Sequence, residues 1–157
     1  MIEVKITKQQ MDRARQLYEF NILKNSVLNG DGNLTGALGE IVVFDYYYKK
    51  GRYVVHSQDR NFDLLIDGFR IEIKTKGVNT IPKPDHTCHV SDYNSTQECH
   101  FYCFVNVFND HSKAYIKGLI SRSRFNEIKQ LKKQGDFDGT FQFKCDTWIV
   151  LNKNLLI

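Results

Sequence analysis

The alternation of apolar and polar residues between positions 59 and 76 is the clearest pattern in the chain. Two runs rich in Leu, Ile and Phe, Phe62 to Ile66 and Phe69 to Thr75, flank an Asp67-Gly68 pair. Asp-Gly between such runs is the strongest short-range hairpin signal, because both residues tolerate a positive φ. We therefore predict a β-hairpin with a two-residue turn.

Side chains alternate between the two faces of a strand, so this hairpin is expected to have one apolar and one charged face. In the predicted register, Asp63 lies directly opposite Glu72. The apolar face is expected to join the core and comprises Leu64, Ile66, Phe69, Ile71 and Ile73. The charged face is the candidate site and carries Asp63, Arg70, Glu72 and Lys74.

Hydrophobic periodicity predicts further elements around the hairpin. Thr7 and Gln10 form a capping box that opens a helix, and Ser121 is a candidate N-cap for another. Residues 29–33, Asn-Gly-Asp-Gly-Asn, predict a loop. Helices are expected after Thr7, from 35 to 48 and from 122 to 134, and strands at 2–6, 52–56, 101–108, 114–120 and near 141–150. This order predicts a single α/β domain with a mixed central β-sheet flanked by helices.

Composition narrows the function classes. The 157 residues are 41% hydrophobic and 13% aromatic, enough for one domain with a packed core. No apolar run approaches the roughly 20 residues of a membrane span, and the first residues do not resemble a signal peptide. We therefore expect a cytoplasmic protein whose four cysteines are thiols. The net charge of +4 is compatible with nucleic-acid binding but does not demonstrate it.

The charged face of the hairpin predicts metal chemistry. Directly opposed residues on antiparallel strands have Cβ atoms about 4.5–5.5 Å apart, where like charges are destabilising. A Mg²⁺ ion between Asp63 and Glu72 would offset their repulsion. Lys74 on the same face could orient an attacking water and stabilise charge on a phosphoryl group. The alternative is an ordinary solvated face of an amphipathic hairpin.

These residues resemble a known signature. Asp63 followed after a hairpin by Glu72-Ile73-Lys74 is similar to the D…(D/E)XK motif of the PD-(D/E)XK nuclease superfamily, which includes Holliday junction resolvases. Phe62 stands where the full signature has Pro. The order of helix, strand and hairpin also matches the superfamily core, roughly over residues 34–119. The resemblance implies a restriction-endonuclease-like fold and Mg²⁺-dependent endonucleolytic hydrolysis of DNA, with Mn²⁺ able to substitute.

The resemblance also assigns roles to residues outside the hairpin. Members of the superfamily often place a glutamate on the preceding helix, and Glu40, costly to bury unpaired among Gly39, Ile41 and Val42, matches that position. The implied metal ligands are Glu40, Asp63, Glu72 and the Ile73 carbonyl, and the implied catalytic residues are Asp63, Glu72 and Lys74. Arg60, Arg70 and Lys76 flank the site and are candidates for DNA phosphate contacts. Cutting both strands would favour a homodimer.

Two other functions stay open. One is a nucleic-acid-binding module on the same fold without catalysis, which intact Asp63, Glu72 and Lys74 disfavour. The other is a zinc-stabilised interaction protein built around residues 86–103. That stretch contains Cys88, Cys99, Cys103, His86, His89 and His100, but lacks a C-x-x-C pair. We expect it instead to form a loop or short helix over the cleft, contacting substrate through Ser91, Asn94, Ser95 or Gln97.

Overall fold

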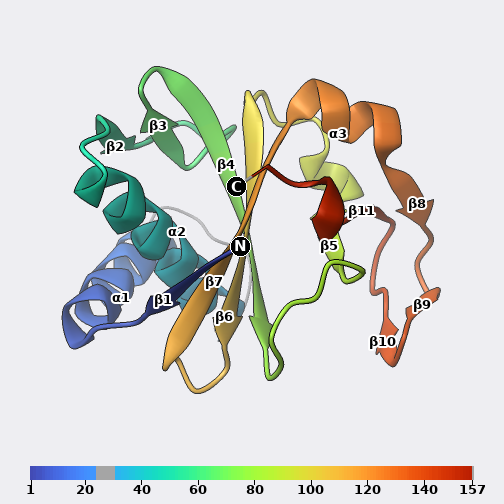
Figure 1. Cartoon of the computed structure of the whole chain (residues 1–157), viewed down its shortest axis with the longest axis horizontal. Helices are drawn as coiled ribbons and strands as arrows, with labels where there is room; N and C mark the ends of the chain where they lie inside the picture. The colour runs from blue at the N-terminus through green and yellow to red at the C-terminus, as the bar shows by residue number, and fades with distance from the viewer. Residues whose placement is uncertain (24–30, 157) are drawn as a thin grey trace.

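A six-stranded mixed sheet forms the centre of the protein (Figure 1). The computed structural model describes residues 1–23 and 31–156, and the side chains of 1–19 and 34–156. The strand order is β1-β7-β6-β4-β3-β2, in which β4 and β6 are parallel and the other neighbouring pairs are antiparallel. The strands are β1 (Ile2–Lys5), β2 (Val54–His56), β3 (Leu64–Ile66), β4 (Phe69–Val78), β6 (Phe101–Phe108) and β7 (Lys113–Ser121).

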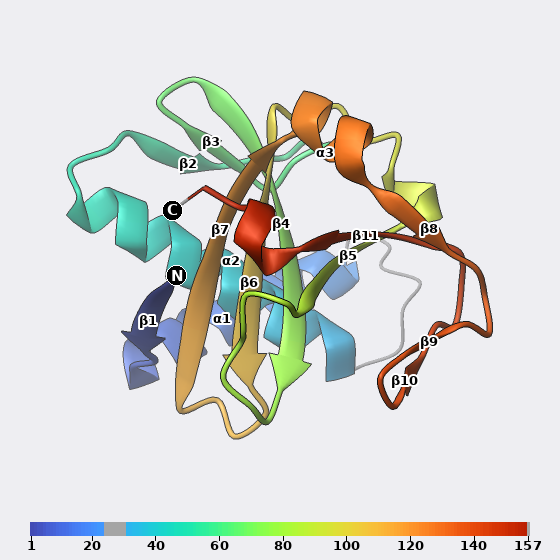
Figure 2. The same ribbon diagram turned by 45° about the vertical axis from the view of Figure 1, so that its right-hand side comes forward.

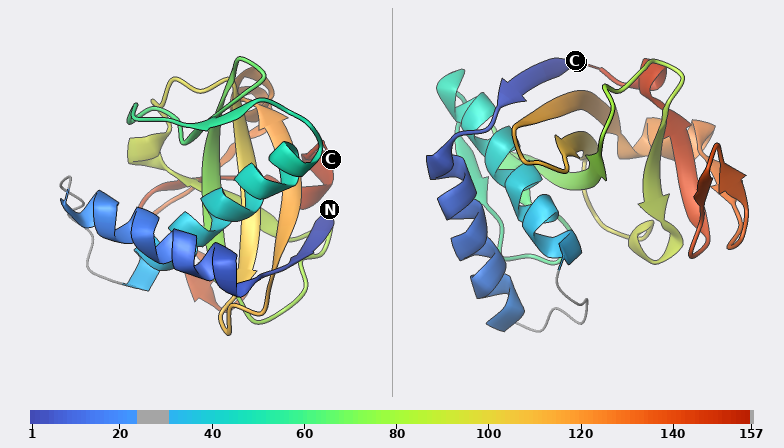
Figure 3. Two further views of the ribbon diagram at one scale, coloured as in Figure 1. Left: turned by 90° about the vertical axis from the view of Figure 1, so that its left-hand side faces the viewer. Right: turned by 90° about the horizontal axis from the view of Figure 1, so that it is seen from below.

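Two long helices, α1 (Lys8–Leu23) and α2 (Asp31–Lys49), cover one face of this sheet (Figure 3). The predicted capping box opens α1, because the Gln10 N–H donates to Thr7 Oγ1 at 3.2 Å and the Thr7 N–H donates to Gln10 Oε1 at 3.0 Å. Between helices and sheet lies the larger core cluster, which includes Leu38, Ile41, Leu64, Ile71, Ile73 and Val105.

A second, three-stranded sheet covers the other face (Figure 2). It consists of β5 (Thr87–Ser91), β11 (Thr147–Leu151) and β8 (Gln130–Lys132), and the helix α3 (Arg122–Ile128) packs beside it. A smaller core cluster joins Tyr102 and Phe104 of β6 to Val90, Phe125 and Val150. The pair β9 (Phe137–Asp138) and β10 (Phe141–Gln142) and the 3-10 turns Asp92–Asn94 and Asn152–Asn154 complete the described elements.

The mixed α/β class and the mixed central sheet are confirmed, whereas flanking by helices holds mainly for one face. The predicted helix over 122–134 is wrong in its second half. Ser121 caps it as expected, accepting from the Arg124 N–H at 3.2 Å, but Lys129 adopts an extended backbone and residues 130–132 pair with β11. Leu131, an apolar residue of this stretch, is 37% exposed. Pairing with a neighbouring strand overrides the helical periodicity here.

The second helix begins earlier than its sequence pattern indicates. Residues 31–33, predicted as a loop, form the first turn of α2, while 29 and 30 lie outside the described residues. Packing of an apolar face contributes more to helix stability than intrinsic propensity, so a helix seated on the sheet can extend through Gly32.

Candidate functional site

The predicted hairpin is present with the expected turn. Asp67 and Gly68 have φ values of 48° and 84°, and Ile66 pairs with Phe69 across them. The apolar face is buried against α2, with one exception: Phe69 is 53% exposed, because at the tip of the hairpin it packs edge-on against His100 and Phe101 instead.

The ladder between β3 and β4 stops before the acidic residues. Its last pair is Leu64 with Ile71, so Asp63 is not directly opposite Glu72 as predicted. The Asp63 N–H instead donates to the Ile71 carbonyl, and Asp63 Oδ2 accepts from the Ile73 N–H at 2.7 Å. Beyond this point β4 continues to Val78 paired only with β6, so Asp63 occupies the free edge of β4.

Glu72 projects from β4 into a nearly enclosed position. Glu72 is only 5% exposed. Its Oε1 accepts hydrogen bonds from Lys74 Nζ at 2.6 Å and from Gln97 Nε2 at 2.8 Å. Its other oxygen, Oε2, is buried and has no hydrogen-bond partner among the described residues. A buried carboxylate oxygen without a partner is costly, which makes this atom a candidate ligand for a cation.

Glu40 reaches the same place from α2. A Cβ on Gly39 would lie only 2.0 Å from Thr75 Oγ1, so the missing side chain lets α2 approach β4 closely. This approach places Glu40 within electrostatic reach of both Asp63 and Glu72, and burial together with these two carboxylates raises its pKa well above the ordinary value. Glu40 is thus close enough to the two acids of the hairpin to interact with their charges, and its role as a metal ligand stays a prediction.

The three carboxyl groups outnumber the one ammonium beside them. Burial, followed by the charge of Glu72, raises the pKa of Asp63 to about 7, although the Ile73 N–H and Lys74 act in the opposite direction. Near neutral pH the group therefore holds protons that a cation would displace. This is the arrangement that binding of Mg²⁺ would relieve.

The residues present fit a divalent cation by donor type. All candidate donors are oxygens, as Mg²⁺ prefers, and one of them is the unpartnered Glu72 Oε2. The Ile73 N–H points to the free edge of β4, and in a strand the carbonyl of the same residue faces the same edge, beside Asp63. Within residues 1–23 and 31–156, however, no group of three or more His, Cys, Asp or Glu side chains is already arranged to hold a metal ion.

The position of Gln97 in the candidate site was not predicted from the sequence. It was one of four candidates for substrate contact, and the structure brings it to the carboxylates: its Oε1 accepts from Lys74 Nζ at 2.9 Å while its amide nitrogen donates to Glu72. The same nitrogen lies 3.4 Å from the Arg60 carbonyl oxygen. The expected short helix precedes it at Asp92–Asn94. Only the tertiary fold, not its spacing, identifies this glutamine.

The predicted phosphate-contacting residues are distributed differently. The side chain of Arg70 lies against His100, with 3.4 Å between Nη2 and Nε2, while Arg60 is exposed. Lys76 stands further along β4, with Nζ 4.7 Å from the centre of the Phe141 ring. Of these three residues, Lys76 alone lines a cavity that adjoins Lys74.

The cluster of cysteines and histidines does not converge. Cys88 and Cys99 are buried in the smaller core cluster, while Cys103 lies in the larger one on the helix side of the sheet, and all three are free thiols. Their burial as small apolar residues accounts for their presence without a zinc ion.

When the sequence is compared with protein-family models and with curated proteins, none matches it. In the described part of the chain, no helix has the length and apolar character needed to cross a membrane. The chemistry of the residues around Glu72 is therefore the basis for a functional assignment.

Proposed function

We propose that this protein is a metal-dependent endonuclease that hydrolyses DNA phosphodiester bonds, on a restriction-endonuclease-like fold of the PD-(D/E)XK type. One observation supports it above the others: the buried Glu72 Oε2, near Asp63 and Glu40 and with Lys74 adjacent, has no hydrogen-bond partner in the described part of the chain. The site offers oxygen ligands for a cation, namely three carboxylates and a backbone carbonyl. It also offers a lysine that could contact the phosphate of the substrate.

Glu40, Asp63, Glu72 and the Ile73 carbonyl would hold Mg²⁺ or Mn²⁺. Such an ion, when bound, lowers the pKa of a coordinated water and neutralises charge on the phosphate. The electrostatic free energy of holding these carboxylates close together would be lower with the ion than without it, because the ion offsets their mutual repulsion.

Lys74 would act on the nucleophile and the reacting phosphate. Its ammonium is fixed between Glu72 Oε1 and Gln97 Oε1, at 2.6 and 2.9 Å, so it is already oriented before substrate arrives. A positioned cation stabilises the charge that develops on a phosphoryl group as it is attacked. Asp63, whose pKa is raised to about 7 in the metal-free protein, would release its proton when the ion binds.

Arg60 and Arg70 would contact DNA phosphates around the cut, with cytoplasmic DNA as the partner. Cleavage of both strands would require two such sites, which favours a homodimer. Four-way junctions, restriction sites and damaged duplexes would all be attacked by the same residues, so the substrate panel must separate them.

The test is cleavage of linear duplex, supercoiled plasmid, single-stranded DNA and a four-way junction, each with Mg²⁺, Mn²⁺ or EDTA. Glu72→Gln keeps the size of the side chain but removes its charge, and Glu98→Gln at an exposed position nearby is the matched control. We expect metal-dependent cleavage by the wild type and the control, and loss of at least about 100-fold in Glu72→Gln. No cleavage of any substrate with either metal would overturn the proposal, and metal-independent DNA binding would then indicate the binding module.

A further inference from the structure

We propose that the cavity between β4 and the second sheet is a phosphate-binding pocket that receives a phosphate group of the nucleic-acid substrate. That this phosphate belongs to a nucleic-acid substrate rests on the proposed function, whereas the capacity to bind phosphate depends on the residues that line the cavity. The cavity has a volume of about 210 Å³ and is lined by residues of five strands, β4, β5, β6, β7 and β10.

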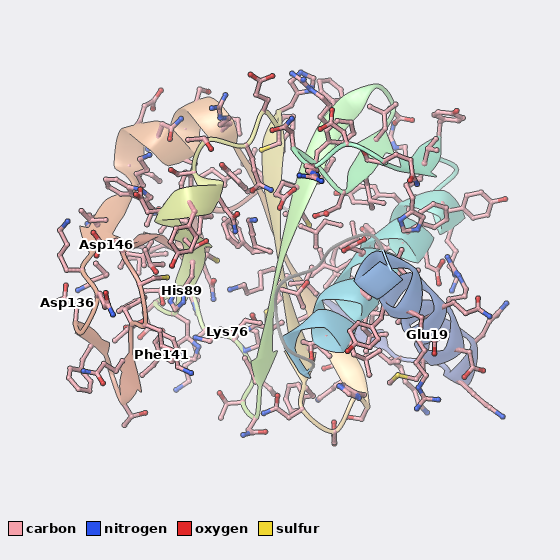
Figure 4. All side chains as sticks on the ribbon, turned by 180° about the vertical axis from the view of Figure 1, so that it is seen from behind. Glu19, Lys76, His89, Asp136, Phe141 and Asp146 are labelled. Atoms are coloured by element: carbon pink, nitrogen blue, oxygen red, sulfur yellow. The ribbon has the colours of Figure 1, made fainter. Side chains whose placement is uncertain are left out.

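Three lysines line this one cavity: Lys74, Lys76 and Lys117. Figure 4 shows Lys76 facing His89 and Phe141 across the gap between β4 and the outer strands. Lys74 is paired with Glu72, but neither Lys76 nor Lys117 has a carboxylate oxygen within 4.0 Å among the described residues. The cavity therefore carries two cationic groups that no acidic side chain of the described chain neutralises by direct contact.

Lys117 is the most informative of the three. Its residue is only 6% exposed, and its ammonium lies 3.5 Å from the Thr87 carbonyl oxygen and 5.8 Å from the centre of the Phe104 ring. The Thr87 carbonyl and the Cys88 thiol are neutral partners of this ammonium, and burial of an ammonium without an anionic partner is costly. An anion in the cavity would supply the missing counter-charge.

The surroundings favour an anion over a cation. Burial and then the charge of Lys117 lower the pKa of Lys76, as expected for two ammonium groups that repel each other, and the charge of Asp138 acts in the opposite direction with a smaller effect. His89 has a pKa of about 4 and is neutral at pH 7, with Nε2 2.7 Å from Thr87 Oγ1. Asp138 interacts directly with Thr87 and His89 rather than with either lysine.

Asn106 adds a second unsatisfied polar side chain. It lines the same cavity, is 5% exposed, and its Oδ1 has no hydrogen-bond partner among the described residues. An amide can both donate to a phosphate oxygen and accept from a hydroxyl group next to it. A phosphate ester would supply counter-charge to the two lysines and accept from the Asn106 amide nitrogen, whereas Asn106 Oδ1 would need a donor such as a water or the O–H of a terminal phosphate.

The size and position of the cavity specify the ligand. Pockets for drug-sized molecules have volumes of about 300–1,000 Å³, so this smaller cavity suits a phosphate group better than a complete nucleotide. Because Lys74 contacts Glu72 and also lines the cavity, the pocket adjoins the acidic site. A phosphate bound here would lie close to the scissile bond, either inside a DNA strand or at its end.

The first experiment measures binding of inorganic phosphate and pyrophosphate to the whole protein in EDTA, by calorimetric titration. Lys117→Met and Lys76→Met keep the apolar stem and remove the charge, and Lys113→Met on the same strand as Lys117 is the control, since Lys113 contacts Glu3 instead. We expect saturable binding that weakens at least tenfold in both pocket variants and stays unchanged in the control. Absence of binding to the wild type, or equal binding by all variants, would overturn the pocket.

A fold defect is separated from a binding defect by thermal unfolding and by Lys117→Arg, which retains the charge and should retain phosphate binding. Loss of binding in Lys117→Arg as well as in Lys117→Met, at unchanged thermal stability, would contradict the charge-based argument.

The second experiment identifies the source of the phosphate. Binding of DNA with a 5′-phosphate, with a 5′-hydroxyl and without ends is compared for the wild type and Lys117→Met. An effect confined to the 5′-phosphorylated substrate identifies a terminal phosphate, and an equal effect on closed circles identifies an internal one. Phosphate binding without cleavage by any metal would retain the pocket and reject the nuclease. Metal-dependent cleavage without phosphate binding would retain the nuclease and reject the pocket.

Discussion

Two neighbouring parts of β4 carry opposite uncompensated charge. At Glu72 three carboxyl groups share one lysine, and burial and mutual repulsion raise the pKa values of Glu40 and Asp63. Four residues further along β4, Lys76 lines a cavity together with Lys117 of β7, neither lysine has a direct carboxylate partner in the described chain, and the pKa of Lys76 is lowered. Lys74 belongs to both regions.

The contrast indicates that one strand can contribute residues to the binding of two ligands of opposite charge. Each region alone is strained by like charges, and the ligand that relieves one is opposite in sign to the ligand that relieves the other. A divalent cation and a phosphate are such a pair, and they occur together in phosphodiester substrates bound with metal. The two regions should therefore respond in opposite directions to changes in charge.

The largest effect is expected for Asp63→Asn. The amide oxygen can still accept from the Ile73 N–H, but the negative charge next to Glu72 and Glu40 is lost. We expect a 100- to 1,000-fold fall in metal-dependent cleavage, about 3–4 kcal/mol, together with unchanged or higher thermal stability because repulsion is removed. Single-turnover cleavage and thermal unfolding measure the two effects, with the exposed Asp85→Asn as control. Full activity in Asp63→Asn would remove this carboxylate from the acidic region.

Gly39→Ala should separate α2 from the acidic region. The new Cβ would meet Thr75 Oγ1 at 2.0 Å and Thr75 Cγ2 at 2.9 Å, so α2 must move outward and carry Glu40 with it. We expect a loss of about 1–3 kcal/mol in the free energy of unfolding, measured by denaturant titration, and weaker binding of Mg²⁺.

Gly36→Ala in the same helix is the matched control, since no atom lies within 4 Å of its Cβ position. It should leave Mg²⁺ binding unchanged and stabilise the helix by about 0.5–1 kcal/mol. Equal effects of the two alanines would contradict the close packing of α2 on β4.

The pH dependence of stability should reveal the acidic region. The pKa of Asp63 is about 7 in the folded protein against an ordinary value of 3.8, so the folded state binds the proton more tightly. Stability from this group is complete below about pH 4 and is lost as the pH rises to about 7, at up to about 1.4 kcal/mol per pH unit.

The measurement is the free energy of unfolding of the metal-free protein from pH 4 to 8, relative to Asp63→Asn. Mg²⁺ should reduce this decline, because the cation favours the deprotonated carboxylate in the folded protein and brings its pKa closer to the ordinary value. A difference between the two proteins that does not change with pH would refute the raised pKa.

The smallest effect is expected for Gln97→Ala, which tests the border between the regions. Removing the amide frees Lys74 Nζ from its 2.9 Å hydrogen bond but leaves the 2.6 Å pairing with Glu72. We expect a several-fold fall in the rate of cleavage with little change in Mg²⁺ affinity, because the lysine is less well oriented rather than lost. A larger fall in metal affinity than in rate would assign Gln97 to the metal region instead.

Local pattern predicted the hairpin well because its signals are local. The Asp67-Gly68 turn, the alternation of β3 and β4 and the nearly continuous apolar run of β6 each depend on residues a few positions apart. The same short range explains the errors. Residues 130–132 follow a helical pattern but pair with β11, and Phe69 has an apolar side chain at a position where the core has already ended.

The site was predictable only in part for a related reason. The acidic residues were recognisable by their spacing, but the sequence could not show that the ladder stops at Leu64 and turns Asp63 onto the Ile73 N–H. Gln97 and Lys117 come from segments distant from the hairpin, and a glutamine in a loop or a lysine in an apolar strand carries no distinctive local signal. Their positions follow from the second sheet covering β4 and β6.

The free edge of β4 has a consequence for association between copies of the chain. An edge strand with unpaired N–H and carbonyl groups can recruit a strand from another molecule. Here the Asp63 carboxylate accepts a hydrogen bond from the Ile73 N–H. Further along the strand, Gly39 lets α2 lie against Thr75. The carboxylate proposed for metal binding thus also shields this edge, so its truncation to alanine should increase aggregation even where the native fold survives.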